Sequence, residues 1–104
     1  MSKGLASIMK QAQMIQTKMT KLQEEAALKT TESTSGGGAV TAIVNGKYEI
    51  LSLTIKKEAV DPEDVEMLQD LIVTAVNDAL RKAHAELSSE MSKITGGMNI
   101  PGLF

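Results

Sequence analysis

Two groups of residues in this sequence have types and spacing that could bind phosphate. The first is the run Gly36–Gly38, which precedes the apolar segment "AVTAIV". A phosphate-binding glycine loop needs a helix directly after it, with Lys and Ser or Thr at fixed positions, whereas here a strand-like segment follows. We therefore predict that the glycines form a flexible turn between two strands. The second group consists of lysines, which could meet phosphates as point charges.

Metal and acid–base chemistry have few candidate residues. The chain contains no Cys and a single His, His84, which lacks a second His or Cys to complete a metal site. A run of acids at the start of a predicted helix fits cap and dipole partners, without the spacing of a calcium loop. This run is Asp61, Glu63, Asp64, Glu66 and Asp70. Because no nucleophile, base and orienting group can be assembled, we predict neither an enzyme nor a cofactor.

The lysines lie on a predicted N-terminal helix over residues 3–28. Its apolar residues recur at alternating spacings of three and four, as in a heptad seam. These residues are Leu5, Ile8, Ala12, Ile15, Met19, Leu22 and Ala26. At about 100° per residue, the lysines project within an arc of roughly 100° centred away from the seam. They are Lys3, Lys10, Lys18, Lys21 and Lys29. Such a face either keeps an exposed helix soluble or contacts an anionic partner.

The next segment, residues 29–56, is predicted to form a three-stranded meander. Residues 29–35 fit a polar edge strand better than a loop, and residues 39–44 and 47–55 are β-branched and apolar. The pair Asn45-Gly46 between the last two predicts a two-residue type I′ turn. The resulting register puts apolar residues on both faces, so the sheet is either covered on both sides or bent by a bulge.

A second long helix is predicted over residues 62–95. Asp61 fits the N-cap, Pro62 the first helical position, and Gly96-Gly97 the stop. The mid-helix pair Asn77-Asp78 could fix a contact between subunits or simply be exposed. A rod of about 50 Å is too long for a small monomer to cover, so self-association is expected. The apolar tail over residues 96–104 is either flexible or an arm that docks on a partner.

The composition narrows the class of protein further. A chain of 104 residues fits one domain, 1–104. Without a signal peptide or a membrane span in the sequence, a cytoplasmic location is expected. The net charge of −2 conceals an asymmetry, since residues 1–57 carry eight Lys and four Glu, and residues 58–104 carry three basic and nine acidic residues. The surface potential is therefore expected to be uneven.

Four segments together resemble the YbaB/EbfC family of nucleoid-associated proteins. They are "IMKQAQMIQTKMTKLQEE" at 8–25, "GGGAVTAIVNGKYEILSLTI" at 36–55, "VEMLQDLIVTAVNDALRKA" at 65–83 and "GGMNIPG" at 96–102. The resemblance covers nearly the whole chain in order. It implies an α+β fold, an α-β-β-β-α protomer in a tweezer-like homodimer, which binds double-stranded DNA in the nucleoid and influences transcription.

In this family the two helices that form the tweezer arms are held responsible for DNA binding. The matching positions here are Lys10, Lys18, Lys21, Arg81 and Lys82, and Lys3 shares the lysine face. Without a recognition-helix signature, we expect contacts to backbone phosphates with low sequence preference, and no membrane or small-molecule partner. The alternative is a dimeric protein-interaction or assembly factor, favoured by the seven methionines and the apolar tail.

Overall fold

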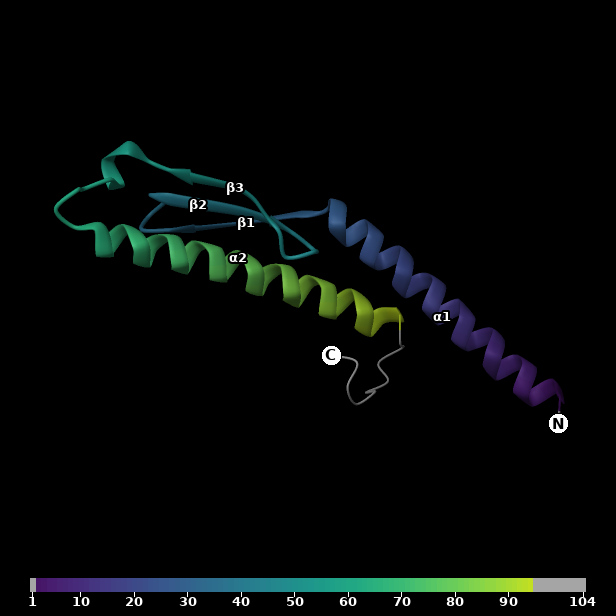
Figure 1. The fold of residues 1–104 in the computed structure, drawn as a ribbon. Helices are drawn as coiled ribbons and strands as arrows, with labels where there is room; N and C mark the ends of the chain where they lie inside the picture. Colours follow the sequence, from purple (N-terminus) through teal and green to yellow (C-terminus); the bar gives the residue numbers. More distant parts are fainter. Residues whose placement is uncertain (1, 95–104) are drawn as a thin grey trace.

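The chain forms an N-terminal helix, an antiparallel three-stranded sheet and a long C-terminal helix (Figure 1). The computed structural model describes residues 2–94, with side chains from residue 4 onward. The elements are α1 (Ser2–Leu28), β1 (Thr30–Ser35), β2 (Val40–Asn45), β3 (Ile50–Ile55), the short 3-10 helix η1 (Lys57–Ala59) and α2 (Val65–Ile94). The predicted order and the α+β class are confirmed. The predicted tail over residues 96–104 lies outside the described residues.

The sheet has the strand order β1-β2-β3, so β2 is central and the polar strand β1 is an edge strand, as predicted. One face of β1 is made of the hydroxyl residues Thr31, Ser33 and Ser35, and these three are buried. Their partners across the ladder are Val44, Ala42 and Val40 in that order. Because paired residues share a face, hydroxyls and small apolar side chains together form the surface on which α2 lies.

Helix α2 packs on this surface through a row of alanines. Ala75 and Ala79 are fully buried and Ala83 is nearly so, and they form one cluster with the central strand's Val40, Ala42 and Val44. The spacing of four residues places the alanines on one side of the helix. Small side chains on both surfaces let the helix approach the sheet closely. Ser35 Oγ uses this proximity to donate a 2.6 Å hydrogen bond to the Leu71 carbonyl of α2.

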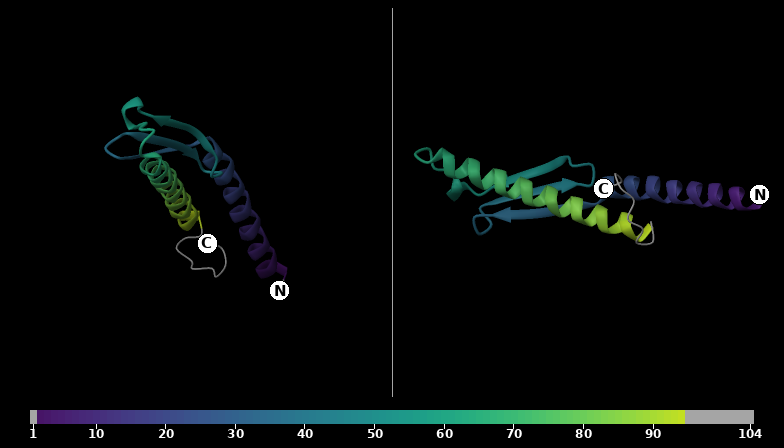
Figure 2. Two further views of the ribbon diagram at one scale, coloured as in Figure 1. Left: turned by 60° about the vertical axis from the view of Figure 1, so that its left-hand side comes forward. Right: turned by 90° about the horizontal axis from the view of Figure 1, so that it is seen from below.

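A β-bulge resolves the question of apolar residues on both sheet faces. Ile43 pairs with Ser52 while Val44 pairs with Ile50, so the register shifts by one residue between the two pairs. Because of this shift, Ile50, Leu53 and Ile55 all pair with residues of β2 that face α2, and the opposite side is largely polar apart from Ile43. Glu32, Thr34, Thr41 and Thr54 lie on that opposite side. In the part of the chain that the structure describes, α2 covers only one face of the sheet (Figure 2).

The glycine run forms the turn between β1 and β2, as predicted. All three glycines have positive φ, at 59°, 67° and 95° for Gly36, Gly37 and Gly38. The turn closes with a hydrogen bond from the Gly38 amide to the Ser35 carbonyl at 3.2 Å. Three consecutive left-handed residues would strain any side chain, which explains why this turn consists of glycine.

The prediction of a two-residue type I′ turn at Asn45-Gly46 is wrong. The loop is longer: the Asn45 amide donates to the Glu49 carbonyl, and the left-handed residue is Tyr48, with φ 62°. A three-residue loop with a left-handed last residue is the next most common hairpin connection. The Asn45 side chain favours it, because its Oδ1 accepts hydrogen bonds from the amides of Lys47 and Glu49. The buried Asn45 thus fixes the loop through its side chain.

The predicted start of the second helix at Pro62 is also wrong, since α2 begins at Val65. Asp61 does not cap it: its carboxylate accepts the Glu63 amide in a preceding turn, closed by Asp64 N donating to the Asp61 carbonyl. Asp64 Oδ1 accepts the Met67 amide at 3.2 Å and is therefore the N-cap. Two acids compete for the cap in the sequence, and the turn at Asp61 leaves that position to Asp64.

Helix α1 projects away from the sheet and gives the molecule its length, with principal-axis extents of 73 × 23 × 16 Å (Figures 1 and 2). Only its C-terminal end is packed, where Leu22 and Ala26 are each 8% exposed. Farther out the predicted seam opens to solvent, with Leu5 62% and Ile8 65% exposed. We call residues 4–21 of α1 the arm, and the sheet with η1 and α2 the body.

Candidate nucleic-acid interface

The arm presents three of the predicted lysines to solvent. Lys10, Lys18 and Lys21 are all exposed. At 100° per residue, Lys10 and Lys21 point away from the side of α1 that carries Leu22 and Ala26, the two residues packed against the body, and Lys18 lies at the edge of that side. They extend over about 16 Å of the helix axis at 1.5 Å per residue. Lys3 belongs to α1, but its side chain lies outside the described side chains. The arm therefore carries a solvent-accessible row of positive charges.

Uncharged polar side chains flank these lysines. They were not among the site residues predicted from the sequence, because that prediction considered charged residues alone. One shallow surface depression is lined by Gln13, Gln16, Thr17, Thr20, Lys21 and Glu24, and a second by Lys10, Gln13, Met14, Thr17 and Lys18. Side-chain amides and hydroxyls also form hydrogen bonds with phosphate oxygens, as lysines do. Gln13 lies three residues after Lys10 and Thr17 four residues before Lys21, and this helical spacing was the signal in the sequence. Thr17 is partly committed, because its hydroxyl donates to the Gln13 carbonyl at 2.9 Å.

Arg81 and Lys82 lie elsewhere, on the part of α2 beside the sheet. Arg81 is 71% exposed and pairs with Asp78 one helical turn earlier. Lys82 Nζ donates to the Glu32 carbonyl of β1 at 3.4 Å. The structure therefore does not bring these two residues into one cluster with the arm lysines. Both already have partners in the body, which makes them weaker candidates for phosphate contacts.

His84 faces the β2–β3 loop. Its Nδ1 lies 3.0 Å from the Tyr48 hydroxyl, and the two rings are tilted by 38°. In the described part of the chain, no group of three or more His, Asp or Glu side chains is arranged to hold a metal ion. The same residues include no helix long and apolar enough to cross a membrane.

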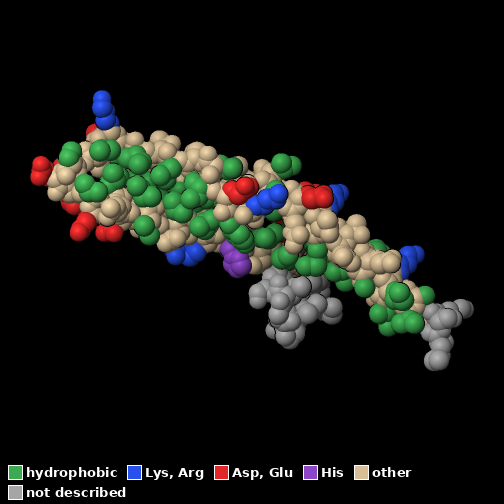
Figure 3. Space-filling view, in the orientation of Figure 1, with side chains coloured by type: hydrophobic (Ala, Val, Ile, Leu, Met, Phe, Trp, Pro, Cys, Tyr) green, Lys and Arg blue, Asp and Glu red, His purple; other side chains and the backbone are tan. Residues whose placement is uncertain are grey.

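An apolar surface runs along the edge of the sheet between β3 and α2 (Figure 3). We call it the β3–α2 surface and define it by Ile50, Leu53, Val73, Val76 and Leu80. Ile50 and Val73 are more than half exposed, at 54% and 56%. Leu80 adjoins Tyr48 at the end of this surface, and Val73 and Val76 follow at helical spacing. β3 is an edge strand here, so its outer backbone groups have no strand partner in the described residues.

Two long helices joined by a short antiparallel sheet, with exposed lysines on the first helix, fit a class of small DNA-binding proteins. The family model described as "YbaB/EbfC DNA-binding family" matches residues 1–98. The chain therefore belongs to the YbaB/EbfC DNA-binding family, and the resemblance drawn from the sequence is confirmed. This family is one of DNA-binding proteins and not of enzymes.

Related proteins match this chain over its full length. A nucleoid-associated protein of Pelotomaculum thermopropionicum is 55% identical over 104 residues, covering 100% of this chain and 99% of the relative. A nucleoid-associated protein of Desulforamulus reducens is 57% identical over 104 residues with the same coverage. The crystal structure of an uncharacterized Helicobacter pylori protein, HP0035, matches with TM-score 0.73 and 24% identity over 88% of this chain and 94% of that one. This last match supports the fold.

Proposed function

We propose that this protein is a nucleoid-associated, homodimeric protein that binds double-stranded DNA through backbone phosphates with low sequence preference, and so affects nucleoid organisation and transcription. The observation that carries the proposal is the solvent-exposed row of Lys10, Lys18 and Lys21 on an arm that extends beyond the body. The names of the relatives, which are nucleoid-associated proteins, give the location.

Phosphate contact is favoured over base reading by the chemistry of the arm. Lysine is a point charge that neutralises phosphate and releases counterions, which gives affinity that depends on salt and hardly on sequence. Arginine, whose bidentate contact with guanine is the commonest specific base contact, occurs once in the chain, and this Arg81 pairs with Asp78. The net charge of −2 keeps each contact weak, so the affinity must come from several contacts at once.

Self-association is supported by the β3–α2 surface. Its apolar side chains lie beside the open edge of β3, and a twofold pairing with a second copy would cover both. A dimer would present two arms and twice the number of lysines. The alternative, a dimeric protein-interaction or assembly factor, is supported by the exposed arm seam, where Leu5 and Ile8 could pack on another protein.

A mobility-shift titration of duplex DNA over several salt concentrations tests the DNA proposal. We expect the triple variant Lys10→Ala, Lys18→Ala, Lys21→Ala to lose affinity similarly for unrelated sequences. Since each phosphate contact contributes about −0.9 to the slope of log K against log salt, a dimer that loses six lysines should lose up to about 5 from that slope. Sedimentation should give the mass of two chains for both proteins.

The matched control removes the same charge from the body, with Lys47→Ala, Lys56→Ala and Lys57→Ala. It should retain affinity within about threefold, because non-specific affinity depends on which charges meet phosphate. Equal losses in the two triple variants would contradict a contact surface on the arm. Binding that ignores salt would contradict phosphate contacts, and no DNA binding by a stable dimer would favour the assembly factor.

A further inference from the structure

The arm is joined to the body by a backbone contact between α1 and the β2–β3 loop. The Gly46 amide donates a 2.8 Å hydrogen bond to the carbonyl of Ala26, in the last turn of α1. That carbonyl also accepts the Lys29 amide at 3.2 Å, where the chain leaves the helix. A helix end normally leaves its last carbonyls without a partner in the helix. Here one of them is held by a loop that is about 20 residues away in sequence.

No side chain fits at Gly46. A Cβ there would lie 2.4 Å from the Ala26 carbonyl oxygen, 2.6 Å from Ala26 Cβ and 2.7 Å from the Ala26 carbonyl carbon. Such contacts require a shift of backbone, which no side-chain rotation can relieve. Gly46 does not have the left-handed φ of Gly36–Gly38, so its own backbone conformation does not require glycine. The requirement for glycine comes from the approach of α1 alone.

The loop that carries Gly46 is rigid enough to limit how closely α1 can approach it. Asn45 is 5% exposed, and its Oδ1 accepts the amides of Lys47 and Glu49 at 2.9 and 3.1 Å. Its Nδ2 donates to Glu49 Oε1 at 2.8 Å. These bonds tie both sides of the loop to one buried side chain. A displacement at this contact would therefore move α1 more readily than the loop.

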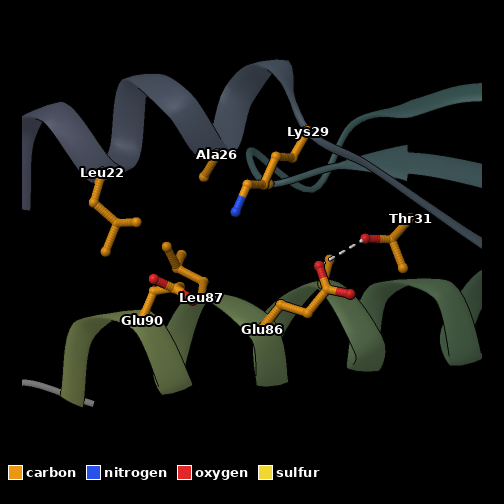
Figure 4. Close-up of a pocket in the computed structure, with 9 residues that line it drawn as sticks. Leu22, Ala26, Lys29, Thr31, Glu86, Leu87 and Glu90 are labelled. Carbon is orange, nitrogen blue, oxygen red and sulfur yellow. Dashed lines mark hydrogen bonds between the residues drawn. The ribbon is translucent and has the colours of Figure 1, made fainter. Parts of the chain in front are cut away.

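Few other contacts hold α1 in place. Figure 4 shows Leu22 and Ala26 of α1 facing Leu87 of α2 across a small pocket, with Lys29 extending toward Glu86 and Glu90. Helix α1 extends for about 33 Å from Ala26 to residue 4, at 1.5 Å per residue. A small tilt at the joint is multiplied along this length.

We infer that Gly46 is a positioning residue: its side-chain-free contact with Ala26 sets the direction of the arm, and with it the fit of the lysine row to DNA. The part that concerns DNA rests on the proposed function. The part that concerns direction does not, since the angle between α1 and α2 can be measured without DNA. Relieving the contact by about 0.8 Å with a pivot near Leu22 tilts α1 by roughly 8°, which moves residue 11 by about 2 Å.

The experiment compares the direction of the arm in wild type and Gly46→Ala. The chain contains no Cys, so spin labels can be attached at Gln11→Cys on the arm and Thr74→Cys on α2, both exposed positions. Dipolar spectroscopy on labelled chains diluted with unlabelled protein should give a modal distance shifted by up to about 2 Å in Gly46→Ala. DNA affinity should fall about fivefold, with the dimer mass unchanged, because misdirected arms cannot engage together.

Gly37→Ala is the matched control for the other hairpin. A Cβ at Gly37 meets nothing within 4 Å, although φ is +67°, so this variant costs stability through strain without touching α1. Its label distance and DNA affinity should match wild type despite the lower stability. A shift of the same size in Gly37→Ala would overturn the inference, because general destabilisation would then explain both variants.

Hydrogen exchange on the wild-type protein adds a test that needs no substitution. The Gly46 amide should exchange far more slowly than the free-loop rate, because it donates to Ala26, and exchange at the free-loop rate would overturn the joint. An unchanged label distance in Gly46→Ala would also overturn it, whatever happens to DNA binding. A shifted distance with unchanged DNA affinity would overturn the role in binding. If wild type binds no DNA, the proposed function fails while the distances still decide on the joint.

Discussion

The body and the arm each contain a long amphipathic helix, but only the body covers the apolar side of its helix. Helix α2 buries a row of alanines on a sheet face made of valines and hydroxyls, so its apolar side is covered within one chain. Helix α1 has a regular apolar seam, yet among the described residues only Leu22 and Ala26 of that seam are buried. The helix ends differ as well, since α2 has Glu66 in its first turn and Lys93 in its last, whereas α1 has neither kind of charge.

The difference teaches where the stability of each helix originates. Isolated helices of fewer than about 15 residues are marginal in water, and most helical stability in proteins comes from tertiary packing of one face. The body supplies that packing itself. The arm does not, so its order depends on the joint at its base and on whatever covers its seam or binds its lysines.

The largest contrast is expected from placing a carboxylate in each region. Val44→Asp puts an unpaired charge at a position that is 0% exposed, and should cost more than about 4 kcal/mol, enough to unfold the body. Ile8→Asp, on the exposed seam, should cost less than about 1 kcal/mol. Urea unfolding followed by circular dichroism measures both. Similar losses would mean that the outer seam is buried in solution.

A smaller contrast is expected along the seam itself. Leu22→Ala removes packing at the base of the arm, where the side chain is 8% exposed, and should cost about 2 to 3 kcal/mol. Leu5→Ala, at 62% exposed, should cost under about 0.5 kcal/mol. Thermal unfolding at several protein concentrations checks this pair. A large, concentration-dependent loss for Leu5→Ala would show that a second copy covers the arm.

The smallest contrast concerns the capped start of α2. Asp64→Ala removes the side chain that accepts the Met67 amide and should cost about 1 kcal/mol. Asp61→Ala removes only the bond to the Glu63 amide in the preceding turn, and should cost about half as much. Urea unfolding of the two variants ranks them. The reverse order would place the functional cap at Asp61, as the sequence alone had suggested.

The periodic features of the fold were predictable from the sequence because they depend on local patterns. The seam of α1 gave a predicted helix of 3–28 against the observed Ser2–Leu28. The glycine run gave a turn, and the alternating hydroxyls of β1 gave a polar edge strand. What alternation could not reveal is that the hydroxyl side of β1 faces α2, since Ser35 finds its partner, the Leu71 carbonyl, only through the tertiary fold.

The errors arose where a tertiary contact overrode a local preference. Asn-Gly favours a two-residue turn in isolation, but here Asn45 organises a longer loop and Gly46 makes room for Ala26. For the candidate site, helical spacing predicted the lysine face of the arm. It could not show that Arg81 and Lys82 are occupied by Asp78 and Glu32, because the second of these partners lies on a distant strand.

The contact between Tyr48 and His84 lets the intrinsic fluorescence of the protein report on the structure of the body. The sequence contains one tyrosine and no tryptophan, so Tyr48 supplies essentially all intrinsic fluorescence. Its hydroxyl is hydrogen-bonded to His84 of α2, and its ring belongs to the β2–β3 loop, two residues after Gly46, which contacts Ala26 of α1. Emission from this ring will therefore follow the separation of the loop from α2 without any added label. Fraying of the arm will not change this emission. Fluorescence therefore distinguishes changes in the body from fraying of the arm.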